Sequence, residues 1–240
     1  FVRRFDATDK IQDALRLGFD IEPMEHLDFG LEYIYKKNNY KDTVLGRTDD
    51  TRNEYYVDAS YEVPDVFKFT AFFDYETVQN NSYHRRSGTN YNPNTAHTTA
   101  AAGYNWREVL DDKNMSYGFV INAPVIKNKL DFVVSWIYDK AAGSADLSVQ
   151  NNLVTPLLNI PNYDDYEKQT LNLKAIYKGI KNLELTLGYA YEHYRYSDAG
   201  YDWYRYVMTT TSSPNTYLTG AYSDPGYNVN LFYLTVKYKF

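Results

Sequence analysis

The last ten residues read Leu231-Phe-Tyr-Leu-Thr-Val-Lys-Tyr-Lys-Phe240. Successive side chains of a β-strand point to opposite faces, so residues of one parity share a face. One face of this stretch is apolar and aromatic, with Phe232, Leu234, Val236, Tyr238 and Phe240. The other is largely polar, with Leu231, Tyr233, Thr235, Lys237 and Lys239. A soluble sheet with one face on a core shows the same alternation. The stretch therefore predicts a strand and leaves its surroundings open.

Tyrosine dominates the composition. Of the 240 residues, 27 are Tyr and 12 are Phe, and the mean hydropathy is −0.59 because Tyr counts as polar. Globular cores are usually built from Leu, Ile and Val, whereas Tyr and Trp favour membrane–water interfaces. No stretch approaches the roughly 18 consecutive apolar residues of a spanning helix. A membrane crossing by this chain would therefore use strands.

The charged and reactive residues point away from several classes of function. A net charge of −6 and a pI of 5.2 give no sign of a nucleic-acid partner. The sequence has no Cys, which rules out disulfides, thiolate metal sites and a covalently attached c-type haem. The four His residues are scattered without metal-site spacing, at His26, His84, His97 and His193. No catalytic triad, phosphate loop or carboxylate dyad stands out. We expect no enzymatic activity and no cofactor or metal in this chain.

The alternation of the last ten residues recurs along the chain. It predicts nine strands, at residues 10–21, 27–36, 54–63, 67–77, 115–123, 130–139, 167–178, 183–194 and 231–240. Short turns at 23–26, 64–66, 124–129 and 179–182 join them in pairs. Long polar loops at about 37–53, 78–114, 140–166 and 195–230 separate the pairs. Residues 106–113 are compatible with one or two turns of helix. The Asp pairs at 49–50, 111–112 and 164–165 fall in these loops and are interpreted as solvated rather than Ca²⁺-binding.

These features together indicate a transmembrane barrel. Strands of about ten residues match a tilted bilayer crossing, and transmembrane barrels alternate short periplasmic turns with long outer loops. Aromatic residues precede the long loops, where the outer aromatic girdle belongs: Tyr33, Tyr35, Tyr75, Trp136, Tyr138, Tyr189 and Tyr191. Unpaired edges cost several kcal/mol per group in lipid, so the strands must close. The predicted fold is all-β, a single domain over residues 1–240 that forms a transmembrane antiparallel up-and-down β-barrel in a bacterial outer membrane.

The strand ending on aromatic Phe240 resembles the last strand of bacterial outer-membrane barrels, which places the C-terminus in the periplasm. Nine is an odd number, whereas single-chain bacterial barrels have an even number of strands. We therefore expect the chain to be the C-terminal part of a larger barrel. The alternative is that one strand has been missed or wrongly counted. The start at Phe1 rather than Met is expected of a mature, cut or incomplete protein.

The polar parity is predicted to line the lumen. Its charged residues are Arg16, Asp20, Asp28, Glu32, Asp58, Glu62, Lys68, Asp74, Glu76, Asp131, Asp139, Lys174, Lys178, Glu184, Glu192, Lys237 and Lys239. Mixed charges of this density suit a wet pore or a wall against a hydrophilic plug, unlike a selectivity ring of one sign. Small residues on the same face either leave room for an approaching group or ease strand curvature: Gly18, Gly30, Gly118, Gly188 and Ala190.

Residues 217–240, Tyr-Leu-Thr-Gly-Ala-Tyr-Ser-Asp-Pro-Gly-Tyr-Asn-Val-Asn-Leu-Phe-Tyr-Leu-Thr-Val-Lys-Tyr-Lys-Phe, resemble the C-terminal end of the MtrB/PioB family of outer-membrane barrels. Tyr201-Asp202-Trp203 fits the same pattern, as do the prolines in short turns at Pro23 and Pro64. The resemblance implies a much larger barrel that carries no haem itself. It also implies that a periplasmic multihaem c-type cytochrome is threaded through the lumen, often meeting a second cytochrome outside at the loops.

The expected function is to sheathe and position that multihaem cytochrome for electron transfer across the outer membrane. The alternative is a general diffusion porin or a substrate-specific channel without a cytochrome partner. A third reading, a soluble β-sandwich binding module, requires a mostly aliphatic interior, which the Tyr-rich apolar parity disfavours.

Overall fold

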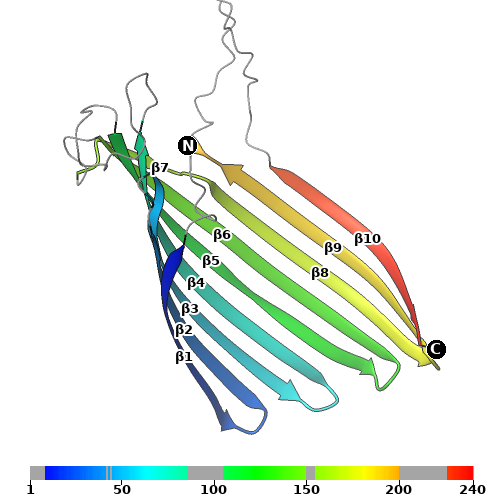
Figure 1. Cartoon of the computed structure of the whole chain (residues 1–240). Helices are drawn as coiled ribbons and strands as arrows, with labels where there is room; N and C mark the ends of the chain where they lie inside the picture. Colours follow the sequence, from blue (N-terminus) through cyan, green and yellow to red (C-terminus); the bar gives the residue numbers. More distant parts are fainter. Residues whose placement is uncertain are drawn as a thin grey trace, which may run out of the picture.

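The structure is a computed structural model that describes residues 9–41, 43, 45–85, 105–149, 155–199 and 226–239. These residues form one antiparallel sheet of ten strands. The strands are β1 (Lys10–Met24), β2 (Leu27–Tyr40), β3 (Gly46–Val63), β4 (Phe67–Arg85), β5 (Asn105–Ile126), β6 (Leu130–Val149), β7 (Leu158–Pro161), β8 (Asp165–Ile180), β9 (Leu183–Ser197) and β10 (Tyr227–Tyr238). Their order is β1-β2-β3-β4-β5-β6-β8-β9-β10, and β7 pairs with the far end of β6 (Figure 1). The predicted all-β, up-and-down architecture is confirmed.

All nine predicted strands are present, but they are longer than predicted. The shortest of them, β10, has 12 residues and the longest, β5, has 22. At about 3.3 Å per residue, β5 extends ~70 Å, well beyond what a tilted crossing of a ~30 Å core needs. Most of the extra length lies on the side of the long loops, which are correspondingly shorter than predicted, whereas the added residues of β1 lie at its short turn. The strands thus continue as a paired wall beyond the apolar layer.

Two local predictions were wrong for the same reason. Residues 106–113 are not helical and lie inside β5, and the third predicted loop contains β7. In these stretches the residues do not alternate regularly between apolar and polar, so the period-2 signal disappears although backbone pairing continues. The fourth predicted loop, the Tyr201-Asp202-Trp203 motif and Phe240 fall mostly or wholly outside the described residues. None of the described residues forms a helix long and apolar enough to cross a membrane.

Four tight turns join the strands at one end of the sheet. Two-residue turns link Met24 to Leu27 and Ile180 to Leu183, while three-residue turns follow β3 and β5. Each turn holds one residue with positive φ, namely His26, Asp65, Asn128 and Asn182. Asn, Asp and His tolerate this backbone region better than other side chains with a Cβ. The predicted short turns are therefore confirmed, with a local reason at each.

The apolar face has no dry core behind it. Phe232, Leu234 and Leu187 keep 75%, 67% and 62% of their surface exposed, and within the described ranges the buried apolar residues are Ala141 and Ala145. An apolar surface of this extent is not stable in water. It fits a wall whose outer face contacts hydrocarbon and excludes the soluble β-sandwich.

Aromatic rings on the apolar face contact one another across neighbouring strands. Tyr33 and Tyr55 lie 5.1 Å apart between centroids, as do Tyr117 and Tyr138, and Tyr189 lies 4.8 Å from Phe232. Such cross-strand pairs add to sheet stability and fix register. They form a belt just before the strands leave the apolar layer, as predicted for the outer girdle.

Glycines on the polar face let neighbouring side chains lie flat against the wall. A Cβ on Gly188 would collide with the ring of Tyr233, and one on Gly30 would collide with the carboxylate of Asp58. A Cβ on Gly118 would meet the backbone carbonyl of Trp136. Gly18 differs, because a Cβ there meets no atom within 4 Å. The close approach of neighbouring atoms therefore explains why Gly30, Gly118 and Gly188 have no side chain. Gly18 faces open space.

We expect Gly188→Val to destabilise the barrel. The ring of Tyr233, a residue of β10, lies over Gly188 of β9 and must move away from the new side chain, and overpacking of this kind costs about 1–3 kcal/mol. The matched control, Gly18→Val, should have a much smaller effect. The measurement is the temperature at which the barrel unfolds in detergent, followed by gel mobility. Equal losses in the two variants would contradict the packing argument.

Candidate functional site

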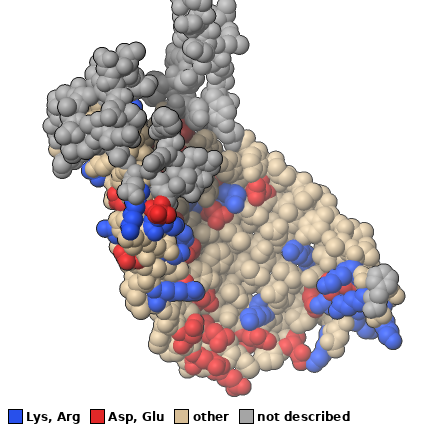
Figure 2. Space-filling view, in the orientation of Figure 1, with Lys and Arg blue, Asp and Glu red and all other residues tan. Residues whose placement is uncertain are grey.

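The predicted lumen residues lie on one face of the sheet. Residues directly opposite each other in neighbouring strands share a face, and the register pairs Asp20 with Gly30, Gly30 with Asp58, and Asp58 with Phe72. The same rows carry every predicted charged position from Arg16 to Lys237, and Lys239 directly follows β10. We call this face the polar wall. Figure 2 looks onto it and shows acidic and basic side chains distributed between neutral ones.

A side-chain hydrogen bond or ion pair links each pair of neighbouring strands of the main sheet across the polar wall. The links run from β1 to β10 as Arg16–Glu32, Ser60–Asp28, Arg52–Glu76, Asn114–Glu76, Ser116–Asp139, Lys168–Asp139, Thr170–Glu192 and Tyr227–Glu192, at 2.5–3.5 Å. We call this series the polar ladder. Six of the seventeen predicted charged residues take part in it, and the wall presents charges of both signs rather than a ring of one sign.

The densest part of the ladder surrounds Arg52. Its guanidinium Nη2 lies 2.7 Å from Glu54 Oε2 and 2.5 Å from Glu76 Oε2, with all three side chains at most 37% exposed. Charge-assisted hydrogen bonds of this kind are stronger than neutral ones. Sequence reasoning missed Arg52 and Glu54, which lie in or next to a predicted loop, and also Lys168. The parity of the adjoining strand, extended through residues 46–53, would have placed Arg52 and Glu54 on this face.

Beyond the aromatic belt, residues 155–165 pack against β6. The Tyr163 amide donates to the Gly143 carbonyl at 3.0 Å, and the Gly143 amide donates to Asp165 Oδ1 at 2.7 Å. A Cβ on Gly143 would collide with the Tyr163 carbonyl, and Ala145 is only 1% exposed. Small residues at these positions of β6 therefore allow the close approach.

Carboxylates gather around this contact. The Tyr196 hydroxyl donates to Asp164 Oδ1 at 2.7 Å and to Asp198 Oδ2 at 3.2 Å, which raises the pKa of Tyr196. Burial raises the pKa of Asp112, and the nearby carboxylates of Asp164, Asp111 and Glu76 raise it further. This end of the wall is therefore acidic and partly dehydrated.

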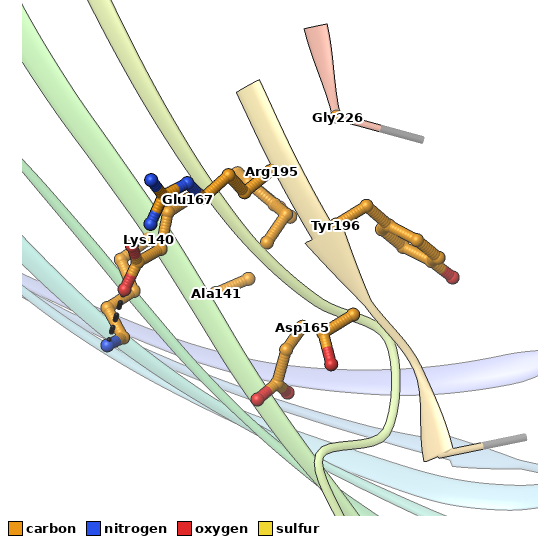
Figure 3. A pocket seen from close by; sticks show the side chains of 9 residues that line it. Lys140, Ala141, Asp165, Glu167, Arg195, Tyr196 and Gly226 are labelled. Carbon is orange, nitrogen blue, oxygen red and sulfur yellow. Dashed lines mark hydrogen bonds and ion pairs between the residues drawn. The ribbon is translucent and has the colours of Figure 1, made fainter. Parts of the chain in front are cut away.

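A pocket of about 460 Å³ opens at the same end, between β6, β8 and β9 (Figure 3). Lys140 Nζ donates a hydrogen bond to Glu167 Oε1 at 2.9 Å, which lowers the pKa of Glu167, and the positive charge of Arg195 lowers it further. Asp165 bonds the Gly143 amide. The charges around the pocket balance and pair with one another, so its lining does not define a ligand of either sign.

The His and Asp positions singled out in the sequence have structural partners. His84 stacks on Trp106 with centroids 3.8 Å apart, and its Nε2 lies 3.2 Å from Glu108 Oε2. His193 Nδ1 lies 2.6 Å from Asn228 Oδ1, and His97 is outside the described residues. The Asp pairs at 49–50 and 111–112 belong to β3 and β5 rather than to loops, which corrects that prediction. Over the described ranges, no group of three or more His, Asp or Glu could hold a metal ion.

One exposed apolar face, one polar face and a tilted antiparallel sheet define part of the wall of a transmembrane β-barrel. The comparison with known families agrees: residues 1–240 match the model described as outer membrane beta-barrel porin, MtrB/PioB. The chain belongs to the MtrB/PioB family and is an outer-membrane barrel protein.

A relative and two solved structures support this assignment. The chain is 23% identical over 206 residues to the outer membrane protein MtrB of Shewanella baltica (strain OS185), covering 84% of the chain but 26% of that protein. The sheet resembles the copper transporter OprC with a TM-score of 0.63, at 10% identity over 95% of the chain and 34% of OprC. It resembles the unliganded ferric citrate transporter FecA with a TM-score of 0.51, at 14% identity over 97% of the chain and 34% of FecA. The two structures show the fold alone.

We expect Asp112→Asn to stabilise the barrel at pH 7. A raised native pKa means that the folded protein holds the proton more tightly than the unfolded chain, so a charged Asp112 opposes folding above that pKa. The gain should shrink as the pH falls through the native pKa toward the ordinary Asp value of about 3.9. Unfolding temperature in detergent, measured across pH, checks this.

The control for Asp112 is Asp111→Asn on the opposite face, where an Asn can still accept the 2.8 Å hydrogen bond from Gln79 Nε2. It should lack the pH-dependent gain. A destabilised Asp112→Asn at pH 7 would show that the charged form is favoured in the folded state.

Proposed function

We propose that this chain is part of a barrel that sheathes a periplasmic multihaem c-type cytochrome and holds it across the outer membrane. The polar wall with its self-paired ladder carries this proposal, together with membership of the MtrB/PioB family. A wall that carries charges of both signs and pairs part of them across its strands offers many hydrogen bonds to a protein surface and does not define a site for one small ligand. The role is physical: the barrel excludes lipid from the haem chain and fixes its position.

The remaining parts of the proposal follow from lipid chemistry. In the described sheet β1 and β10 each have one neighbour, and unpaired strand edges are not tolerated in hydrocarbon. The chain covers 26% of its MtrB relative. We propose that further strands complete the barrel, that the short turns and the C-terminus face the periplasm, and that the long-loop end is available to an extracellular cytochrome.

The proposal requires that electrons cross the membrane only when barrel and cytochrome are both present. Liposomes holding the complete barrel with its cytochrome should pass electrons from an external reductant to an enclosed acceptor dye. Liposomes with the barrel alone should not pass electrons. Ion conductance by the barrel alone, with no haem protein co-purifying, would instead favour the diffusion porin.

A bulky residue on the polar wall should displace the cytochrome. We expect Gly18→Trp to lower the haem retained with the purified barrel by about tenfold or more, since overpacking costs about 1–3 kcal/mol. Gly18 is suited to this test because a side chain there meets no neighbouring atom of the wall. Ala59→Trp, on the apolar face, is the matched control and should retain haem as the unmodified barrel does. Equal haem content in all three proteins would contradict a partner packed against this wall.

A further inference from the structure

The short-turn end of the sheet separates positive from negative charge. At this end, over residues 20–28 and 61–69 of β1–β4 and their turns, the exposed acidic residues are Asp20, Glu22, Glu25, Asp28, Glu62 and Asp65, with Lys68 as the exposed Lys or Arg among them. We call this set the acidic arm. At the same end, over residues 127–131, 178–184 and 236–239, the exposed cations are Lys127, Lys129, Lys178, Lys181, Lys237 and Lys239. We call this set the basic arm. Figure 2 shows the two groups toward opposite sides of that end.

Ion pairs compensate the two arms only in part, and one of them joins Lys68 to Glu62 inside the acidic arm at 4.0 Å. Lys127 Nζ contacts Asp65 Oδ2 at 2.6 Å where the arms meet, and Lys178 Nζ contacts Asp131 Oδ2 at 2.6 Å inside the basic arm. By contrast, Lys129, Lys181, Lys237 and Lys239 have no carboxylate of the described ranges within ion-pair distance, and neither Glu22 nor Asp28 has a cation there. This differs from the polar ladder higher on the wall, where charges pair across neighbouring strands.

The centres of the two arms lie far apart, although the arms touch at Asp65 and Lys127. The β1–β2 and β3–β4 turns are separated from the β5–β6 and β8–β9 turns and β10 by about five strand spacings on average, or ~24 Å at ~4.8 Å each. The Debye length at physiological ionic strength is about 8 Å. The outer turns of one arm are therefore screened from those of the other, and an approaching molecule meets opposite charge at the two sides.

We call the short-turn end of the sheet, with its two arms, the rim. We propose that the rim docks the periplasmic cytochrome of the proposed function in one rotational orientation. The partner would present a basic surface to the acidic arm and an acidic surface to the basic arm. This inference rests on the proposed function and on the proposed periplasmic position of the short turns. Complementary fields of this kind guide encounter and fix register more than they add affinity. The partner then contacts the polar wall in an orientation that the rim has already fixed.

The test uses the complete barrel and its periplasmic partner, with two charge reversals on either arm. Glu22→Lys with Glu25→Lys alters the acidic arm, and Lys181→Glu with Lys239→Glu alters the basic arm. Each double variant should lower partner retention about tenfold at low salt and less at high salt. The control is Lys113→Glu, an exposed residue on the apolar-face parity near the other end of β5, which should not change retention. Gel mobility confirms that every variant has assembled.

Orientation is measured by crosslinking from one cysteine at a time, which is practical because the chain has no Cys. Met24→Cys reports the acidic arm and Asn182→Cys the basic arm. The proposal expects the first to capture basic segments of the partner and the second to capture acidic ones. The same segments at both probes, or unchanged retention in both double variants, would overturn it.

Two further outcomes are decisive. If the basic-arm variant loses binding to anionic phospholipid vesicles while keeping its partner, the lysines contact lipid headgroups and the docking proposal is wrong. If the unmodified barrel retains a partner without haem that still gives segregated crosslinks, the docking proposal stands and the cytochrome function fails.

Discussion

The structure depends on one constraint: no backbone N–H or C=O group can remain unpaired in hydrocarbon. Antiparallel pairing meets it strand by strand, and the sheet follows chain order because tight turns return each strand beside its predecessor. Positive-φ residues such as Asn182 make these turns short. Once pairing has fixed the backbone, successive side chains point to opposite faces. One face contacts lipid, and the other contacts water or an enclosed protein. The exposed apolar face and the polar wall are consequences of that division.

Side chains on the two faces are stabilised in different ways. Toward lipid, exposed Leu, Phe and Tyr need no partner, and their aromatic pairs such as Tyr33–Tyr55 mark the border of the apolar layer. On the other face, the polar ladder joins charged and polar side chains across every strand boundary of the main sheet. Glycines such as Gly188 let rings lie flat there. In the proposed function, a wall built in this way positions an enclosed protein.

Sequence reasoning was sufficient wherever the two faces meet different solvents. The nine strands, their turns and the face of each charged residue follow from period-2 alternation, as in Leu183–Tyr194. It was insufficient where both faces are wet, since residues 46–53 and 105–114 show no alternation yet continue as β3 and β5. Arg52 and Asp112 were therefore placed in loops. The contact of Gly143 with Tyr163 and the pairing of β7 depend on residues distant in sequence, which parity does not encode. The acidic and basic arms can be recognised only when the strand order shows which turns lie at the same end of the sheet.

The central claim is that alternate side chains contact lipid and that the others contact water or an enclosed protein. Site-directed spin labelling along β9 of the complete barrel, without a cytochrome, tests it most directly. Labels at Leu185, Leu187 and Tyr189 should be relaxed mainly by oxygen dissolved in the bilayer, and labels at Glu184, Thr186 and Ala190 mainly by a water-soluble nickel chelate. Nickel access at the first three positions, or no alternation along the strand, would contradict the account.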